Sequence, residues 1–460
     1  MAASAASGDV SVPVAIVGAG ACGLTAAIAL REAGVECLLL ERDARPQGST
    51  ALSSGFIPAA PTRWQQEAGV DDSAACFAAD IDAKSQGRAA PHLVRAYTEA
   101  SAAALALLAR HGITFELLDG FLYPGHSVRR MHALPERTGA ALVSALDAAA
   151  VKLGADLLCN ARVVALDADR AGRVQRLCLE RPGGRIETLA CARVLLACNG
   201  FGGDAAMVAE HLGAMRDAPF AGHAGNDGSA IRFGRALGAS LADLSGYQGH
   251  GGWAVPQGAL ISWALIMRGG VQVNAQGVRF HDESAGYSEA AAAVLAQPGG
   301  VAWMVFDEPV LALARSFPDF CAAEAAGALR SAADTAALAG VIGCDASVLA
   351  RTVAGIGAGV TDGFGRRFER ALSPPWHAVK VTGALFHTQG GLDIDASCRV
   401  RRRDGAPMPN LWAAGGAARG VSGDAVWGYL SGNGLLSAVA GGYLAAQAIA
   451  ASLTRTRDHR

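Results

Sequence analysis

Val14-Ala-Ile-Val-Gly-Ala-Gly-Ala-Cys-Gly23 is an apolar run that breaks into the pattern Gly18-x-Gly20-x-x-Gly23. An Ala-rich segment follows, and a second apolar run, Cys37-Leu-Leu-Leu-Glu41, ends on an acid. This order predicts a strand, a helix and a second strand that together bind a dinucleotide. Gly18 permits the tight turn, Gly20 lets the backbone approach a pyrophosphate, and Gly23 lets the helix pack close to the strand. The helix N-terminus attracts the phosphates, and the acid accepts a hydrogen bond from the ribose 2′-OH.

The composition is that of a large enzyme with no charged partner surface. The 460 residues carry a net charge of −2, with a sequence pI of about 6.6, so we expect neither nucleic acid nor an anionic membrane as partner. We expect two domains at this length, and no apolar run long enough to span a membrane. The opening Met1–Gly8 lacks the features of a signal peptide, so a cytoplasmic location is expected. Ten cysteines are scattered without a Cys-x-x-Cys pair, which predicts no disulfide and no metal site.

Small-residue segments after Glu41 favour FAD over a nicotinamide cofactor. Gly48-Ser-Thr-Ala-Leu-Ser-Ser-Gly55 is a loop of the kind that folds over a flavin and its pyrophosphate. Val194–Gly203 is an apolar strand that runs into glycines, and Asn226-Asp-Gly228 precedes a helix. Leu411-Trp-Ala-Ala-Gly-Gly416 repeats the pattern of a strand that ends in glycines. The whole series, in this order, predicts an FAD site.

We expect the FAD contacts to come from these segments and from one residue of a further strand, Val163. The expected residues are Gly18, Ala19, Gly20, Ala21, Cys22, Gly23, Glu41, Arg42, Gly48, Ser49, Thr50, Ser53, Ser54, Gly55, Val163, Asn199, Gly200, Asp227, Gly415, Gly416, Asn433, Gly434 and Leu435.

The chain resembles the flavoprotein family of soluble fumarate reductases, succinate dehydrogenase flavoprotein subunits, urocanate reductases and 3-ketosteroid dehydrogenases. Beyond the FAD fingerprint, the resemblance rests on Gly270–Glu283, His387-Thr-Gln-Gly-Gly-Leu392 and Gly428–Ala438. Family members with covalent flavin carry a His in the loop after the ribose acid. Ser49 stands at that place here, so the resemblance implies FAD that is held noncovalently.

The same resemblance implies an α/β fold with an inserted domain. A Rossmann-like FAD-binding domain would be formed by residues 1–250 and 383–460. An α+β capping domain would be formed by residues 251–382. Substrate would lie between the cap and the flavin.

Part of the substrate site of the fumarate reductases is matched in residue type. Those enzymes grip the carboxylates of the substrate with two histidines, a hydroxyl and an arginine. His250, in Tyr247-Gln-Gly-His250, matches the first histidine, and Ser262 stands where the family has its hydroxyl. His387 matches the second histidine.

The differences from the fumarate reductases point away from a dicarboxylate substrate. Tyr287, four residues after Glu283, takes the place of their proton-donating arginine, and Tyr429 takes the place of their carboxylate-clamping arginine. The Glu and Arg of their proton relay are matched by Trp263 and Ile266. A phenol cannot replace a guanidinium that binds a carboxylate in bidentate fashion. The pattern therefore favours a neutral substrate with a carbonyl group.

The 3-ketosteroid dehydrogenases offer a closer match to this pair of tyrosines. Their base is a Tyr in a context that Glu283-Ser-Ala-Gly-Tyr287 resembles, and Tyr429 would polarise the substrate ketone. Tyr123 and Trp263 are expected beside Ser262 in the substrate pocket. The predicted function is an FAD-dependent dehydrogenase that removes α,β hydrogens from a carbonyl-bearing, cyclic ketone and passes hydride to flavin N5.

Alternatives to this function stay open on the sequence alone. The same site could serve an ene-reductase of the fumarate reductase type, acting on an activated C=C bond. A flavin-binding protein with an eroded site is a third reading. The sequence leaves the substrate, the direction, the electron acceptor and the oligomeric state undecided. It also leaves open whether Tyr287 or a histidine moves the proton, and whether Arg129, Arg130 and Arg137 touch the substrate or the surface.

Overall fold

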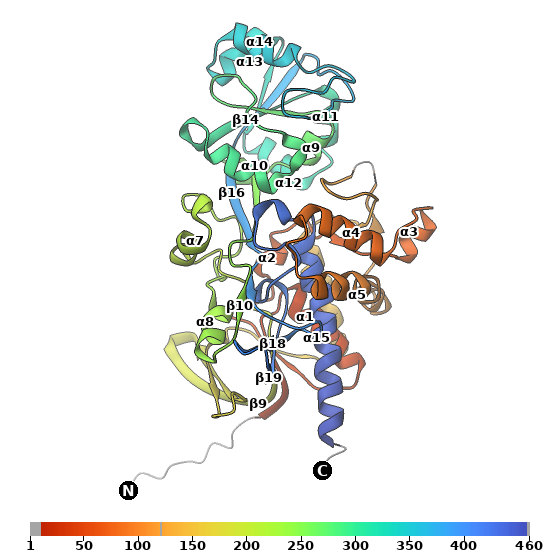
Figure 1. Ribbon diagram of the computed structural model, residues 1–460, viewed down its shortest axis with the longest axis vertical. Coiled ribbons are helices and arrows are strands. Elements are labelled where there is room, and N and C mark those ends of the chain that lie inside the picture. The colour runs from red at the N-terminus through yellow and green to blue at the C-terminus, as the bar shows by residue number, and fades with distance from the viewer. Residues whose placement is uncertain (1–10, 120–121, 458–460) are drawn as a thin grey trace.

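The computed structural model describes residues 11–119 and 122–457, in which a mostly parallel sheet and an antiparallel sheet lie along the long axis (Figure 1). The predicted α/β fold class is confirmed by this architecture. The segment Met1–Gly8, on which the expected location rests, lies outside the described residues.

The first sheet is built around strand β1, which carries the glycine motif at its end. Its order is β18-β19-β9-β1-β2-β6, and β8 and β7 extend it from β9. The strands from β19 to β6 run parallel, and β7, β8 and β18 pair antiparallel. The bounds are β1 (Ser11–Val17), β2 (Leu38–Leu40), β6 (Asp156–Leu158), β7 (Arg162–Ala168), β8 (Val174–Arg181), β9 (Arg185–Leu196), β18 (Arg399–Arg401) and β19 (Pro407–Ala413).

Helix α1 (Ala21–Glu32) is buried on all sides from Ala21 to Leu30. It packs against α5 (Pro91–Arg110), α6 (Gly139–Lys152) and α15 (Asn433–Arg457). A helix that is apolar all round needs such complete cover. A Cβ on Gly23 would lie 1.9 Å from the carbonyl oxygen of Gly18, so only glycine allows this approach of helix to turn.

The second sheet is antiparallel and has the order β12-β11-β16-β14-β13, with β15 also paired to β16. The bounds are β11 (Tyr247–Ala254), β12 (Ala259–Leu260), β13 (Val271–Val273), β14 (Val301–Asp307), β15 (Leu329–Ala332) and β16 (Trp376–Thr388). The helices around it are α9 (Ala264–Met267), α10 (Tyr287–Leu295), α11 (Glu308–Ala314), α12 (Pro318–Ala325), α13 (Thr335–Ile342) and α14 (Ala346–Ala354).

Strands β11 and β16 connect the two regions of the molecule (Figure 1). The predicted limits of the cap, residues 251 and 382, fall inside these two paired strands. The division of the chain at those residues stays a prediction.

Smaller elements surround the space between the sheets. They are α2 (Gly48–Ala51), α3 (Arg63–Glu67), α4 (Ala74–Ser85), α7 (Ala205–His211), α8 (Ser229–Ala236), β3 (Ile57–Pro58), β4 (Glu116–Leu117), β5 (Met131–Ala133), β10 (Leu241–Ala242) and β17 (Gly391–Leu392). Strand β5 pairs with β3 and β4, and β10 pairs with β17.

Helix α15 has the length and composition of a membrane span over Asn433–Thr454, so the expectation that no apolar run is long enough to span a membrane is wrong for this helix. Its most apolar window is 56% buried inside the fold, and it packs on α1 and α5. Its apolar composition is therefore that of a core helix.

Two alanine substitutions should distinguish a glycine needed for stability from a glycine needed for FAD binding. Gly23→Ala should destabilise the FAD-free protein by about 1–3 kcal/mol, because the new methyl overpacks against Gly18. Gly20→Ala should leave the FAD-free protein unchanged, because its Cβ would meet only Thr50 Oγ1, at 3.4 Å, yet it should block close approach of the pyrophosphate. Thermal unfolding and FAD titration of both variants test this. Equal melting temperatures for the two would contradict it.

Candidate active site

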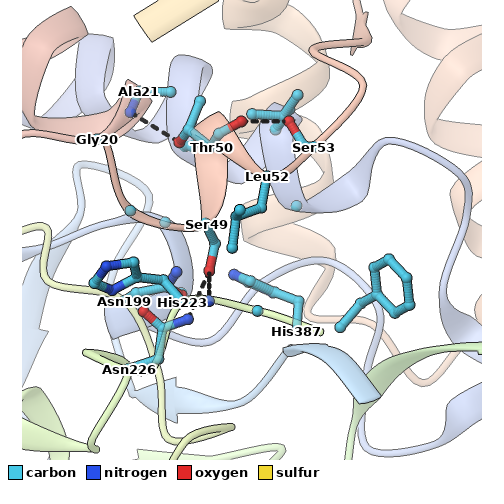
Figure 2. Close-up of a pocket in the computed structure, with 18 of the residues that line it drawn as sticks. Gly20, Ala21, Ser49, Thr50, Leu52, Ser53, Asn199, His223, Asn226 and His387 are labelled. Atoms are coloured by element: carbon cyan, nitrogen blue, oxygen red, sulfur yellow. Dashed lines mark hydrogen bonds between the residues drawn. The ribbon is translucent and has the colours of Figure 1, made fainter. Parts of the chain in front are cut away.

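A pocket lies where the glycine turn, α2 and the ends of β11 and β16 meet (Figure 2). Gly18 has a φ of 104°, which favours glycine, and the turn leads into the first turn of α1. The N-cap residue of α1 is Gly20, which has no side chain to cap the helix, and the first turn of α1 lines the pocket as a candidate anion site.

Glu41 follows β2 and is buried against the glycine turn. Its Oε2 accepts from the N–H of Ala19 at 2.9 Å, and its Oε1 accepts from the N–H of Asp43 at 3.0 Å. Burial raises the pKa of Glu41, and these two N–H groups oppose that rise. The carboxyl group thus ties the turn to the strand end and lies in the pocket wall, where a ribose hydroxyl would meet it.

The Gly48–Gly55 loop folds over the pocket through hydroxyl groups (Figure 2). Thr50 Oγ1 accepts from the N–H of Ala21 at 3.1 Å, which joins α2 to α1. Ser49 Oγ accepts from the N–H of His223 at 3.1 Å and from Nδ2 of Asn226 at 2.7 Å. These bonds close the loop onto residues 223–226.

Most of the residues expected to hold FAD line this pocket. They are Gly18, Ala19, Gly20, Ala21, Cys22, Glu41, Arg42, Gly48, Ser49, Thr50, Ser53, Ser54, Gly55, Val163, Asn199, Gly415, Gly416, Gly434 and Leu435. A helix N-terminus, a glycine turn, a buried acid and a hydroxyl-rich loop in one continuous pocket fit a flavin dinucleotide.

Gly23, Gly200, Asp227 and Asn433 are not among the lining residues, and their contact with FAD stays a prediction. Gly23 packs against Gly18, and a Cβ on Gly200 would lie 1.9 Å from Thr388 Oγ1, so both serve close packing. Asp227 pairs with arginines and bonds Ser229 at the start of α8. The side chain of Asn433 is turned to Ser422.

The other end of the pocket is lined by stacked aromatic rings. The His250 ring stacks on Tyr287 with centroids 4.8 Å apart and an interplanar angle of 22°. Trp263 meets the His250 ring edge-on at 5.5 Å, and the rings of Tyr287 and Tyr429 lie 6.0 Å apart. All of the predicted substrate-side residues, His250, Ser262, Trp263, Tyr123, Tyr287, Tyr429 and His387, line this one pocket.

Tyr287 and Tyr429 share a hydrogen-bond chain. The Tyr287 hydroxyl interacts with those of Ser431 and Tyr429, and the N–H groups of Gly434 and Gly432 interact with the Tyr429 oxygen. Burial raises the pKa of Tyr287 well above its usual value and raises the pKa of Tyr429 to about 12. Both phenols are therefore protonated at neutral pH, and the Tyr429 oxygen has more donors to stabilise a negative charge.

His250 and His387 are neutral at the same pH. Burial lowers the pKa of His250 to about 3 and that of His387 to about 4. The N–H of Gly252 donates to Nδ1 of His250 at 3.0 Å, so the ring proton sits on Nε2. His250 is thus a neutral hydrogen-bond donor.

A bulge in the pairing of β11 and β16 sets the direction of His387. Gln248 pairs with His387, but the next residue, Gly249, pairs with Leu385, so Phe386 is an extra residue in its strand. Adjacent side chains of a regular strand point to opposite faces, and a bulge changes this. Phe386 and His387 both line the pocket as a result.

Buried polar contacts hold the cap side of the site. Tyr123 bonds the Ser262 side chain, and burial raises the pKa of Tyr123. Nε1 of Trp263 donates to the Glu283 carbonyl at 3.0 Å. The Glu283 carboxylate pairs with Arg279 at 2.6 Å and with Arg366 at 2.9 Å. Burial favours the neutral form of Glu283, but its arginine partners outweigh this and leave its pKa lowered. The segment that leads into Tyr287 is therefore anchored.

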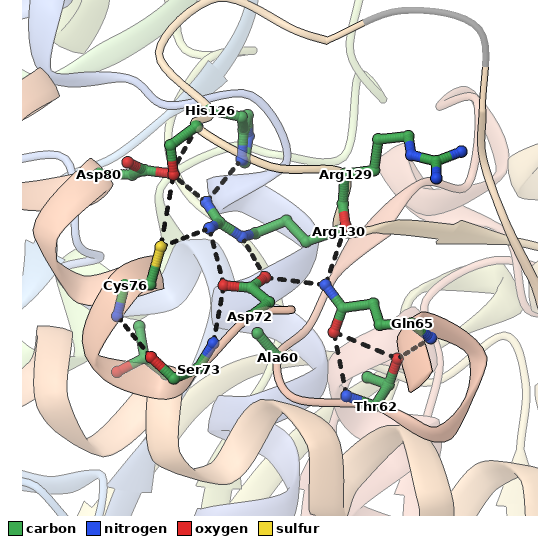
Figure 3. A network of polar contacts seen from close by, with 12 residues as sticks. Ala60, Thr62, Gln65, Asp72, Ser73, Cys76, Asp80, His126, Arg129 and Arg130 are labelled. Carbon is green, nitrogen blue, oxygen red and sulfur yellow. Dashed lines mark hydrogen bonds and ion pairs between the residues drawn. The ribbon is translucent and has the colours of Figure 1, made fainter. Parts of the chain in front are cut away.

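A buried network around Arg130 supports the site from the other side (Figure 3). Arg130 Nε donates to Asp72 at 3.0 Å, and Nη1 pairs with Asp80. Nη1 also donates to Nδ1 of His126 at 3.2 Å, and Nε2 of His126 contacts the Ser431 carbonyl oxygen at 2.9 Å. Because Nδ1 accepts from a cation, Nε2 carries the proton and donates to Ser431. Arg130 is thus an internal anchor for the residue that bonds Tyr287.

Of the arginines that the sequence left undecided, Arg137 lines the FAD pocket, and the Arg129 side chain lies away from the network (Figure 3). Sequence reasoning missed Ser431, Phe386 and the residues at the start of α12, Phe317, Pro318 and Asp319, which also line the pocket. Ser431 stands two residues after Tyr429, which could have singled it out. No sequence signal connects α12 with the site.

In the described part of the chain, no group of three or more His, Cys, Asp or Glu residues is placed to hold a metal ion.

Known proteins resemble this chain along nearly its whole length. The model of the FAD binding domain family matches residues 13–435. NADH:fumarate oxidoreductase of Klebsiella pneumoniae (strain 342) is 28% identical over 424 residues, which cover 90% of this chain and 45% of that protein. The chain thus spans less than half the length of that relative. 4-Oxocyclohexanecarboxylate 2-dehydrogenase of Sinomonas cyclohexanicum is 27% identical over 511 residues, covering 88% and 87% of the two chains.

Solved structures show the same fold. The open conformation of a flavocytochrome c3 fumarate reductase superposes with a TM-score of 0.81 at 28% identity, covering 97% of this chain and 79% of that one. The 3-ketosteroid-delta4-(5alpha)-dehydrogenase of Rhodococcus jostii RHA1, in complex with 4-androstene-3,17-dione, gives a TM-score of 0.76 at 25% identity, covering 96% and 97%. The resemblance seen in the sequence is confirmed. The chain belongs to the FAD-binding family of fumarate reductase and succinate dehydrogenase flavoproteins, which are FAD-dependent oxidoreductases of CH–CH groups.

Proposed function

We propose that the protein holds FAD noncovalently and removes α,β hydrogens from a cyclic substrate that carries a ketone. The observation that carries this proposal is the group of hydroxyls at the substrate end, Tyr287, Tyr429 and Ser431, beside two neutral histidines. These groups are hydrogen-bond donors and proton carriers without charge. They suit a carbonyl oxygen better than a pair of carboxylates, which need cationic partners.

The proposed reaction removes a proton from the α-carbon and a hydride from the β-carbon of the substrate. With Tyr429 in its deprotonated form, Tyr287 would take the acidic proton from the α-carbon while its own proton passes to the Tyr429 oxygen. Neutral donors such as the N–H of His250 would stabilise the enolate oxygen, and one donor of this kind is worth about 3–4 kcal/mol. When bound, FAD supplies the acceptor for the β-hydrogen as hydride. An electron acceptor that is not yet identified would reoxidise it.

The relatives support a cyclic ketone without fixing which one. The name of the Sinomonas enzyme gives a ring that carries both a ketone and a carboxylate, and the Rhodococcus structure holds a steroid ketone. Both would match the aromatic lining and the paired phenols. The substrate of this chain is left open within that class.

A second function, reduction of an activated C=C bond, is favoured by one observation. The raised pKa values of Tyr287 and Tyr429 keep both phenols protonated, which is the form that a proton donor needs. Desaturation needs the opposite form. The two directions share the same residues, and the redox partner would decide between them.

The purified protein should be yellow, and acid or heat should release intact FAD, because Ser49 stands in place of the linking histidine. Glu41→Ala should weaken FAD binding by about 1–3 kcal/mol, the cost of unpaired buried groups. Equilibrium dialysis measures this, with the exposed residue Glu67 as a control in Glu67→Ala. Flavin that stays on the denatured polypeptide would disprove the noncovalent mode.

Anaerobic mixing with saturated cyclic ketones should bleach the flavin, and mixing with succinate should not. Stopped-flow absorbance over a panel of cyclic ketones, steroids and carboxylic acids is the direct test of the function. Fumarate reduction with a viologen dye at a rate typical of enzymes, about 10 s⁻¹, would overturn the proposed substrate class. Turnover with only activated alkenes would establish the second function instead.

Tyr287→Phe should lower the rate of flavin reduction by about 10²–10⁴-fold with little change in substrate affinity, because it removes a proton-transfer group but keeps the ring. The wild-type rate should rise with pH, because raised pKa values leave the base form scarce at neutral pH. Tyr429→Phe should weaken substrate binding as well. Wild-type rates in Tyr287→Phe would move the proton-transfer role to His250, His387 or Tyr123.

A further inference from the structure

A one-directional chain of hydrogen bonds ends at His387. Nδ2 of Asn433 donates to Ser422 Oγ at 3.0 Å, and that hydroxyl donates to Oε1 of Gln389 at 2.9 Å. Nε2 of Gln389 is then a donor, and it lies 2.8 Å from Nδ1 of His387. Gln389, Ser422 and Asn433 are each no more than 3% exposed, so water does not compete for these bonds.

This series of hydrogen bonds allows only one tautomer of the neutral His387 imidazole. A neutral imidazole has one N–H, and burial keeps His387 neutral. Since Nδ1 accepts from Gln389, the proton sits on Nε2. His387 lines the pocket (Figure 2), and its Nε2 lies beside another lining residue, Gly416, where an added Cβ would be 2.7 Å away.

The two histidines of the site are therefore fixed by different means. In His250 a backbone N–H occupies Nδ1, which no substitution of a side chain removes. In His387 a side chain occupies it. The hydrogen-bond role of His387 is thus set by the residue at position 389.

We propose that Gln389, oriented by Ser422 and Asn433, is a positioning residue that holds His387 as a neutral Nε2–H donor toward the oxygen of the substrate carbonyl. The donor form of His387 follows from the contacts alone. Its target, the carbonyl oxygen, rests on the proposed function. His387 then serves as a donor to the enolate and not as the base.

Gln389→Glu reverses this arrangement at nearly constant shape. A carboxylate can only accept, so it would take the proton of His387 onto Nδ1 and turn Nε2 into an acceptor. The new charge would also raise the pKa of His387. As pH falls through that raised pKa, the ring gains a second proton and the Nε2–H donor returns. Activity relative to wild type should therefore drop about 10²-fold at alkaline pH and recover on acidification.

Matched variants separate this role from simple packing. Gln389→Met keeps the volume without donor or acceptor, so its activity ratio to wild type should be reduced but flat with pH. Gln276→Glu adds the same charge on an exposed turn and should behave as wild type. Ser422→Ala frees the amide of Gln389 and should give an intermediate loss.

Nitrogen-15 NMR of the imidazoles in the substrate-free holoenzyme tests the proposal without any substrate, with His387→Phe to assign the resonance. We expect the Nε2–H form in wild type, the Nδ1–H form in Gln389→Glu at alkaline pH, and a mixture in Gln389→Met. An Nδ1–H form in wild type would overturn the proposal, as would a pH-independent activity ratio for Gln389→Glu. If every ketone fails as substrate while wild type shows the Nε2–H form, the proposed function falls and the positioning role stands.

Discussion

The pairing of β11 with β16 is the interaction on which the site depends. These strands connect the two regions of the molecule, and their bulged register brings His250, Phe386 and His387 to one pocket wall. In a regular ladder, one of the last two side chains would face away. The extra residue in β16 turns two adjacent side chains toward the substrate end of the pocket. At the cofactor end, the glycine turn lacks side chains, so the backbone itself can lie close to a ligand.

Removal of water sets the charge state of every group at the substrate end. The same burial that makes His250 and His387 neutral makes Tyr287 and Tyr429 hold their protons. These four neutral groups discriminate between ligands by the direction of their hydrogen bonds. Direction is then fixed by neighbours, by a backbone N–H for one histidine and by an amide side chain for the other.

The cofactor half of the site could be predicted from the sequence, because its chemistry is encoded in contiguous segments. The glycine turn, the acid and the loop from Gly48 each occupy a few adjacent residues, and most of them line the pocket. A motif does not separate residues that contact the cofactor from neighbours that serve packing, as Gly23 and Asn433 do here. The substrate half was predicted only where a family pattern supplied it. Helix α12 reaches the site through contacts between distant segments, which no spacing in the sequence reveals.

The Arg130 network has a consequence for how this pocket could change during evolution. Arg130 and His126 anchor the segment that begins with Tyr123, and both side chains are buried. Tyr123 faces the cavity from the same segment. Within this short segment, Arg130 and His126 hold the backbone in place, and Tyr123 shapes the substrate pocket. Replacement of Tyr123 can reshape the cavity while the anchor keeps Ser431 in place, so selectivity can drift without loss of the catalytic geometry.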